Sequence, residues 1–366
     1  MAGYAKQPRK EVFEVENLSN KLIAPSRIWF SLTGLCNNEC QWCYRDGSEI
    51  KEFLDTDFIF SAAKTFSSIG TKKCTIIGGE PTLHKDFELI VNVLTREMDF
   101  SCTFVTNGRM LAHKIPDSWK SNKKLHVVVS LHGADEDHYA LNTGSRGFNK
   151  TVMAIKGLVA AGINHSVNVV ISKENTPRIM DFIKIVKELN ASLLCFTFAM
   201  PSMDDDGYQT DPFKMANTVK EVHLLCEEYK QEHTFIFSLP WCLLGEELLD
   251  HLILNKQLIF NCPIGKGRGV VIKEDSSLAL CTHLSSRTLL SKQKLKENIL
   301  DKDSFLRFWN TEEMDSLRQA IDVHRHEKCV KCKYRLFCKG GCPLWWSAYD
   351  FSGAIEKISN EGGCIA

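Results

Sequence analysis

Three cysteines near the start of the chain follow the spacing C-x3-C-x2-C: Cys36, Cys40 and Cys43. Thiolates at such spacings hold iron–sulfur clusters, and clusters that only transfer electrons use four of them. A loop with three thiolates leaves one iron open to a substrate or cofactor. A structural zinc ion is the alternative, but it would need a fourth Cys or His, and none lies in this loop. The spacing therefore favours an open iron–sulfur cluster over zinc.

A second group of cysteines occupies the C-terminal part, where seven of the last 105 residues are Cys. The whole chain has 15 cysteines, so disulfides cannot pair them all, and spaced cysteines outside a secreted context indicate metal ligands. This segment has little other material for a core, so we expect it to need bound metal to fold. Two zinc sites, with His324 or His326 as extra ligands, are one alternative. The seven are Cys262, Cys281, Cys329, Cys332, Cys338, Cys342 and Cys364.

The composition excludes several classes of protein. Lys+Arg and Asp+Glu are each 45, so the net charge is zero and argues against a nucleic-acid partner held by bulk positive charge. The sequence has no apolar run of about 18 residues, so it predicts no membrane-spanning helix. The N-terminus has no apolar signal segment, so we expect a cytoplasmic protein.

Short apolar runs alternate with amphipathic segments from residue 27 onward, which predicts an α/β protein. Strand–helix alternation implies a parallel sheet with helices outside, and six such units make a partial (β/α)6 barrel. Its chemistry should lie at the carboxyl ends of the strands. The predicted strands are 28–32, 74–77, 102–105, 126–131, 167–171 and 193–198; the predicted helices are 57–68, 87–95, 148–161 and 178–189.

After Pro201 the sequence predicts that the alternation stops. A helix at 212–231, a strand at 234–239 and a helix at 243–254 then lead to the Cys-rich end. We therefore divide the chain into an N-terminal extension, a partial barrel, a bridging region and a small Cys-rich α+β domain. Their bounds are 1–26, 27–231, 232–261 and 262–366.

A second motif, TIIGGEPTL, places Gly78, Gly79 and Glu80 at the end of the second strand, beside the cysteine loop. Glycine lets the backbone approach a ligand closely, and a carboxylate can accept from an ammonium group. Together with C-x3-C-x2-C, this motif resembles the radical S-adenosylmethionine (SAM) superfamily over residues 27–201. The resemblance implies a [4Fe–4S] cluster whose open iron binds SAM, and reductive cleavage to a 5′-deoxyadenosyl radical that abstracts a substrate hydrogen. It also implies an electron donor of the flavodoxin or ferredoxin kind.

The same resemblance assigns contacts to SAM. Trp42 is expected near the adenine and residues 78–80 at the amino group. Ser130, at the end of the fourth strand, supplies a polar contact, and Leu194 a second adenine contact. Asn142 stands where related maturases carry an arginine at the carboxylate, with Arg146 four residues further on, so that contact stays open.

The segment HEKCVKCKYRLFCKGGCPL, with the two earlier cysteines, resembles the SPASM extension of radical SAM enzymes, which implies two auxiliary [4Fe–4S] clusters. The resemblance assigns a distal set, Cys329, Cys332, Cys338 and Cys364, and a proximal set, Cys262, Cys281 and Cys342. The proximal set lacks the fourth cysteine of the best-known maturases. Its fourth position is either open, filled by substrate, or taken by Cys242.

SPASM proteins mostly act on peptides, so we predict a radical SAM oxidoreductase that modifies a ribosomally synthesised precursor peptide by hydrogen abstraction and cross-link formation. A dehydrogenase or epimerase of a small molecule is the first alternative, and a noncatalytic iron–sulfur or zinc scaffold the second. Thr282 and His283 stand where sulfatase maturases carry a catalytic Asp, which argues against formylglycine formation. His132 is a candidate general base. Asp204, Asp205 and Asp206 are expected in a solvated loop.

Overall fold

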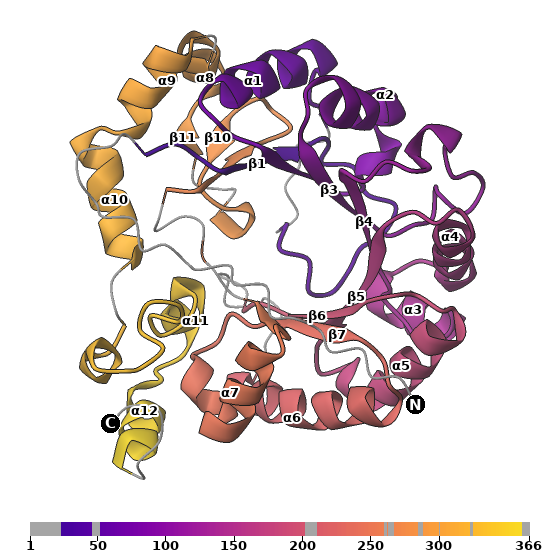
Figure 1. Cartoon of the computed structure of the whole chain (residues 1–366), viewed down its shortest axis with the longest axis vertical. Helices are drawn as coiled ribbons and strands as arrows, with labels where there is room; N and C mark the ends of the chain where they lie inside the picture. The colour runs from indigo at the N-terminus through magenta and orange to yellow at the C-terminus, as the bar shows by residue number, and fades with distance from the viewer. Residues whose placement is uncertain are drawn as a thin grey trace, which may run out of the picture.

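The computed structural model describes residues 23–45, 52–201, 211–259, 262, 267–284, 288–299, 301–322 and 325–360. Within them, one eleven-stranded sheet has the order β11-β10-β9-β1-β2-β3-β4-β5-β6-β7-β8. The sheet curves, with strands lining the inside and helices surrounding it (Figure 1). Among the described strands, its two end strands do not pair with each other, so the barrel is incomplete.

The strands alternate with helices from β1 to β8. The strands are β1 (Arg27–Ser31), β2 (Lys73–Ile77), β3 (Ser101–Thr106), β4 (Leu125–Ser130), β5 (His165–Ile171), β6 (Leu194–Phe198), β7 (His233–Ile236), β8 (Leu258–Ile259), β9 (Gly269–Ile272), β10 (Leu278–Ala279) and β11 (Thr288–Leu290). The six strands predicted for the barrel are all present as β1 to β6, and they pair in parallel.

The helices cover the outer face of the sheet or come after its last strand in the sequence. They are α1 (Thr56–Ser68), α2 (Phe87–Asn92), α3 (Glu136–Thr143), α4 (Phe148–Ala160), α5 (Ile179–Glu188), α6 (Pro212–Glu228), α7 (Glu246–Leu254), α8 (Lys292–Ile299), α9 (Lys302–Trp309), α10 (Glu312–Asp322), α11 (Pro343–Ala348) and α12 (Ser352–Asn360). Short helical turns are η1 (Pro81–Leu83), η2 (Val93–Glu97), η3 (Asp117–Trp119), η4 (Thr176–Arg178), η5 (Trp241–Leu244), η6 (Thr282–Leu284) and η7 (Glu327–Val330). No described helix is both long and apolar enough to cross a membrane.

Local sequence signals set the element ends as expected. Asp55 caps α1 by accepting from the backbone N–H of Phe58 at 2.8 Å, and Gly144 ends α3 in the left-handed conformation. The strands are apolar on the side that faces the helices, as in β1, where Ile28 and Phe30 are fully buried. Burial against helices explains why these strands have such apolar sequences.

The predicted end of the alternation after Pro201 is wrong. Helix α6 leads to β7, which pairs in parallel with β6, and α7 leads to β8, which pairs in parallel with β7. At the other edge, β9 pairs in parallel with β1. Strand β8 is too short to give a periodic signal, and the β9–β1 pairing joins segments far apart in sequence. The sheet thus runs across two boundaries of the four-part domain division, which itself stays a prediction.

Candidate functional site

A cavity of about 1860 Å³ occupies the inside of the curved sheet. Residues 34–45, which follow β1 and are called the cluster loop below, line it with Cys36, Cys40 and Cys43. Side chains alternate across each strand, so every second residue faces inward. The carboxyl ends of β2 to β6 complete the wall near the loop. The structure therefore brings the three cysteines to the end of the barrel where chemistry was predicted.

The end of α3 and Arg109 hold the cluster loop in place. The N–H of Glu39 donates to the carbonyl of Thr143 at 2.7 Å. Arg109, just after β3, donates from Nη1 to Oδ1 of Asn38 at 2.8 Å and to Oγ of Ser145 at 3.1 Å, and also to the carbonyl of Asn37. These contacts hold the loop from two separate parts of the chain, the end of α3 and the segment after β3.

The two glycines after β2 pack against the cluster loop. The N–H of Gly79 donates to the carbonyl of Thr33 at 2.7 Å, and a Cβ added to Gly79 would lie 2.2 Å from the carbonyl oxygen of Leu35. A Cβ on Gly78 would lie 2.8 Å from the carbonyl oxygen of Thr33. Only glycine permits this approach, which explains the motif physically.

Glu80 connects the end of the second strand to the end of the third through hydrogen bonds. Its buried carboxylate accepts from Oγ1 of Thr106 at 2.7 Å and from the N–H of Asn107 at 2.8 Å, and also from the N–H and hydroxyl of Thr82. Burial raises the pKa of this carboxyl group, and the four donors oppose that rise. Because its oxygens accept from the chain itself, Glu80 positions the cavity wall.

Trp42, Ser130 and His132 line the cavity, and their roles toward SAM and as a base stay predictions. The rings of Trp42 and His132 lie 6.1 Å apart between centroids. Burial lowers the pKa of His132 to about 4, so its ring is neutral near pH 7. Asn168, which pairs with Ser130 across β4 and β5, faces the same space and donates to Oγ1 of Thr197 at 3.1 Å.

Two predicted SAM contacts do not line this cavity. Leu194 begins β6 and lies in the hydrophobic core, so it is at the wrong end of the strand; residues 198–200 line the cavity from β6 instead. Asn142 is fully buried, and its Nδ2 donates to the carbonyl of His132 at 2.6 Å and to Asn175 at 2.8 Å. Its backbone carbonyl accepts from Gln41 of the cluster loop, so Asn142 positions the loop. Arg146 is exposed and pairs with Asp137 at 3.0 Å.

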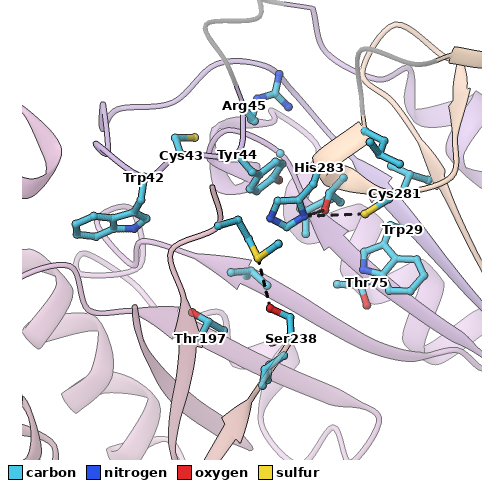
Figure 2. Close-up of a pocket in the computed structure, with 18 of the residues that line it drawn as sticks. Trp29, Trp42, Cys43, Tyr44, Arg45, Thr75, Thr197, Ser238, Cys281 and His283 are labelled. Atoms are coloured by element: carbon cyan, nitrogen blue, oxygen red, sulfur yellow. Dashed lines mark hydrogen bonds between the residues drawn. The ribbon is translucent and has the colours of Figure 1, made fainter. Parts of the chain in front are cut away.

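The proximal set lines the same large cavity as the cluster loop. Cys262, Cys281 and Cys342 all contribute to its wall. Figure 2 shows His283 between Cys281 and Tyr44, with its Nδ1 4.0 Å from the Cys281 sulfur and its ring 5.1 Å from the Tyr44 ring. The proximal set and the cluster loop therefore share one cavity.

A buried ion pair fastens this region to the cluster loop. Nη2 of Arg45 lies 2.5 Å from Oε1 of Glu274, which is in the turn after β9 and also accepts from the hydroxyl of Ser31 at 2.9 Å. Both charged side chains are nearly inaccessible to solvent, at 11% and 5% exposure. Sequence reasoning missed this pair and Arg109, because neither belongs to a motif and their partners are distant in sequence. Asn107, which follows β3, both accepts the turn hydrogen bond from the N–H of Arg109 and lines the cavity.

The described members of the distal set lie around a separate small cavity. Cys329, Cys332 and Cys338 line it together with Cys242. Cys364 lies outside the described residues. Cys242 does not line the large cavity, so the structure does not place it with the proximal set.

Among the described residues, one group of His, Cys, Asp or Glu has ligand atoms that all lie within 4.8 Å of one another, namely His223, Glu227 and His233. It lies outside both cavities.

Residues 30–189 match the radical SAM superfamily, so the chain carries a radical SAM domain, as its motifs predicted. Among curated proteins, the GTP 3′,8-cyclase of Actinobacillus succinogenes is 30% identical over 186 residues, which cover 48% of this chain and 55% of that protein. The chain thus spans about half the length of this relative. The probable GTP 3′,8-cyclase of Thermoplasma volcanium is 24% identical over 303 residues, which cover 80% of this chain and 85% of that protein.

Two solved structures share the fold over most of the chain. SuiB of Streptococcus suis bound to S-adenosylmethionine superposes with a TM-score of 0.65 at 15% identity, covering 89% of this chain and 75% of SuiB. The structure of anSMEcpe with bound AdoMet superposes with a TM-score of 0.65 at 20% identity, covering 87% of this chain and 90% of that one. These likenesses confirm the α/β fold of the radical SAM type. The domain implies a [4Fe–4S] cluster that binds SAM, and three thiols, a close glycine turn and an open space beside them fit such a group.

Proposed function

We propose that this protein is a radical SAM enzyme with two auxiliary [4Fe–4S] clusters, and that it modifies a precursor peptide by oxidative cross-linking. The observation that carries the proposal is the shared cavity. The cluster loop and the proximal set line one space, so a substrate there can meet both centres. A scaffold without chemistry would not need two open thiol sets facing a common cavity of about 1860 Å³.

When bound, the cluster and SAM supply the hydrogen-atom abstraction, and the auxiliary clusters supply electron acceptance beside the substrate. The protein's own contribution is binding and orientation. Cys36, Cys40 and Cys43 would hold the cluster. The backbone at Gly78 and Gly79 would bind the amino group of SAM, and Ser130 would offer a hydroxyl from β4. Trp42 provides a flat apolar surface for the adenine.

Since neither Asn142 nor Leu194 belongs to the described lining of the cavity, we propose other partners for two parts of SAM. Asn168 and Thr197 are polar and inward-facing, and they stand beside Ser130, so they suit the carboxylate. Residues 198–200, at the carboxyl end of β6, suit the adenine. The walls formed by β1 to β6 exclude water from the reacting groups.

The size of the cavity supports a peptide substrate. Pockets for small ligands measure about 300–1,000 Å³. This space is larger, and it must also hold SAM and two clusters. The same fold holds a precursor peptide in SuiB and a peptide in anSMEcpe, which is consistent with the proposal. We further propose a cytoplasmic location and a flavodoxin- or ferredoxin-like electron donor, with neither nucleic acid nor membrane as partner.

A nucleotide such as GTP is the second candidate substrate. The curated relatives are named GTP 3′,8-cyclases, and one alignment covers 80% of this chain. Arg27, Lys73 and Arg268 line the cavity at the amino ends of β1, β2 and β9, where they could meet phosphates.

The test uses full-length protein purified and reconstituted without oxygen. We expect about twelve irons per chain and reductive cleavage of SAM to 5′-deoxyadenosine. Cys36→Ala should abolish cleavage, and the matched control Cys195→Ala, a buried cysteine on β6, should retain it. Retained cleavage in Cys36→Ala, or zinc in place of iron, would refute the proposal.

Substrate class is tested by mass spectrometry. Short peptides encoded beside the gene and GTP are each incubated with enzyme, SAM and reductant. A peptide that loses two hydrogen atoms supports the peptide proposal. Conversion of GTP with no peptide change supports the nucleotide instead.

A further inference from the structure

The small cavity beside η5 has an unusual lining. Four of its ten lining residues are cysteines, Cys242, Cys329, Cys332 and Cys338, and among the described residues it has no His, Asp or Glu. Cys242 comes from η5, which follows β7 of the barrel, whereas the other three come from the C-terminal segment. All four side chains are buried. Thiols are therefore the metal-binding groups that the described residues offer around this space.

Close backbone packing fixes Cys242 relative to the other three thiols. A Cβ on Gly341 would lie 2.7 Å from the carbonyl oxygen of Ser238, so the two segments meet at backbone distance. The N–H of Cys342 donates to the same carbonyl at 2.7 Å, and the indole N–H of Trp345 donates to the hydroxyl of Ser238 at 2.9 Å. The segment that carries Cys242 is thus fastened to the turn that carries Cys338.

Hydrogen bonds to sulfur mark this cavity as a site for thiolates. The N–H of Trp241 donates to the sulfur of Cys338 at 3.3 Å, and the N–H of Tyr334 donates to that of Cys332 at 3.4 Å. The N–H of Asn38 donates in the same way to Cys36 in the cluster loop, at 3.4 Å. Hydrogen bonds to cluster sulfurs are one means by which proteins tune reduction potentials.

Positive side chains stand beside these thiols. Arg335 and Lys339 line the same small cavity. An iron–sulfur cluster held by four thiolates is anionic, so positive side chains beside it lower the cost of burying it.

A left-handed turn separates the two metal positions. Lys339, Gly340 and Gly341 all have positive φ, at 49°, 86° and 85°. This turn directs Cys338 to the small cavity and Cys342, four residues later, to the large one. Two adjacent cysteines of one short segment therefore serve two different centres.

We propose that Cys242 is the fourth protein ligand of the distal cluster, with Cys329, Cys332 and Cys338, and that Cys364 is not required there. This inference rests on the proposal that the C-terminal cysteines hold auxiliary clusters. It makes the distal cluster a closed four-thiolate centre, as expected for electron transfer. It also removes Cys242 from the proximal set, whose three thiols face the substrate cavity and leave an iron open to it.

The test compares Cys242→Ala, Cys364→Ala and wild type, purified as full-length holoprotein without oxygen. Iron and sulfide are counted, and the reduced clusters are followed by electron paramagnetic resonance. We expect Cys242→Ala to lose about four irons, or to keep a three-iron centre with its own signal, and Cys364→Ala to keep the wild-type content. Cys226→Ala, a fully buried cysteine on α6 outside both cavities, is the matched control and should also keep it.

Cys242→Ser keeps the inference testable if the alanine variant does not fold. An oxygen ligand in place of sulfur should shift the midpoint potential of one cluster and leave the other two unchanged. Wild-type iron content and spectra in Cys242→Ala, or three unchanged potentials in Cys242→Ser, would overturn the assignment. Wild-type protein with far fewer than twelve irons would instead refute the proposed function, so the two failures are distinguishable.

Discussion

Gly79→Ala should shift the position of the cluster loop without removing any of its thiols. The added Cβ would lie 2.2 Å from the carbonyl oxygen of Leu35 and 2.8 Å from that of Gly34, where ordinary contact begins at 3.4 Å. Both obstacles are backbone atoms, so no side-chain rotation relieves the clash, and the loop must shift by about 1 Å. Overpacking of this kind costs about 1–3 kcal/mol of stability.

The expected effect on turnover is larger than the effect on folding. Reacting groups held about 1 Å from their productive positions lose about 100-fold in rate. Gly78→Ala, whose Cβ would lie 2.8 Å from the carbonyl oxygen of Thr33, should show a smaller loss. Gly353→Ala is the matched control, because its Cβ would meet nothing within 4 Å and α12 should gain up to about 1 kcal/mol.

The assay measures the rate of 5′-deoxyadenosine formation at saturating SAM, with iron content and thermal midpoint determined on the same samples. The predicted rates of 5′-deoxyadenosine formation decrease in the order Gly353→Ala, Gly78→Ala, Gly79→Ala. A Gly79→Ala variant with wild-type rate and midpoint would show that the loop tolerates a side chain there. That result would refute the argument from close approach.

Three further predictions concern the groups that support the cavity. Glu274→Gln should lower the free energy of unfolding in urea by about 3–5 kcal/mol, since it leaves the Arg45 charge buried without its partner; Asp137→Asn, in an exposed pair, should change it little. The pKa of His132 is about 4 in the folded protein and about 6.5 in the unfolded chain. Between these pH values only the unfolded chain takes up that proton, so the free energy of unfolding should fall as pH drops from about 6.5 to about 4. His132→Gln should flatten this pH dependence of the thermal midpoint, and an unchanged slope would show that His132 titrates normally. Arg109→Ala removes the donor to Asn37, Asn38 and Ser145, so a chelator should remove the proposed cluster of the cluster loop faster than from wild type; equal loss rates would contradict the holding role of Arg109.

The placements that the sequence predicted correctly are those encoded within short segments; the roles of these residues toward a cluster and SAM stay predictions. Cys36, Cys40 and Cys43 lie within eight residues, and Gly78 to Glu80 follow one apolar strand, so strand direction alone places both motifs at the same end of the sheet. It is harder to predict which end of a strand a residue occupies. The family resemblance predicts Leu194 as an adenine contact, but Leu194 begins β6, and a residue at the amino end of a strand cannot reach the opposite end.

Pairings between distant segments were not predictable from periodicity. Arg45 and Glu274 are 229 residues apart, and only the fold shows that their charges meet. Asn142 shows a different limit. An amide can line a cavity or bond to backbone, and its sequence position does not distinguish the two; here its Nδ2 bonds to the carbonyl of His132, and its own carbonyl supports the cluster loop.

The pairing of β9 with β1 explains how one chain brings two sets of cysteines to one cavity. Strand β1 leads directly into the cluster loop, and β9 runs parallel beside it, with Arg27 to Phe30 opposite Gly269 to Ile272. The turn after β9 carries Glu274, and β10 returns antiparallel toward Cys281. Hydrogen bonds between β1 and β9 therefore set the distance between the cluster loop and Cys281 rigidly, as a flexible linker could not. On this view the Cys-rich segment is not an appended module, because its first strands form the edge of the barrel sheet itself.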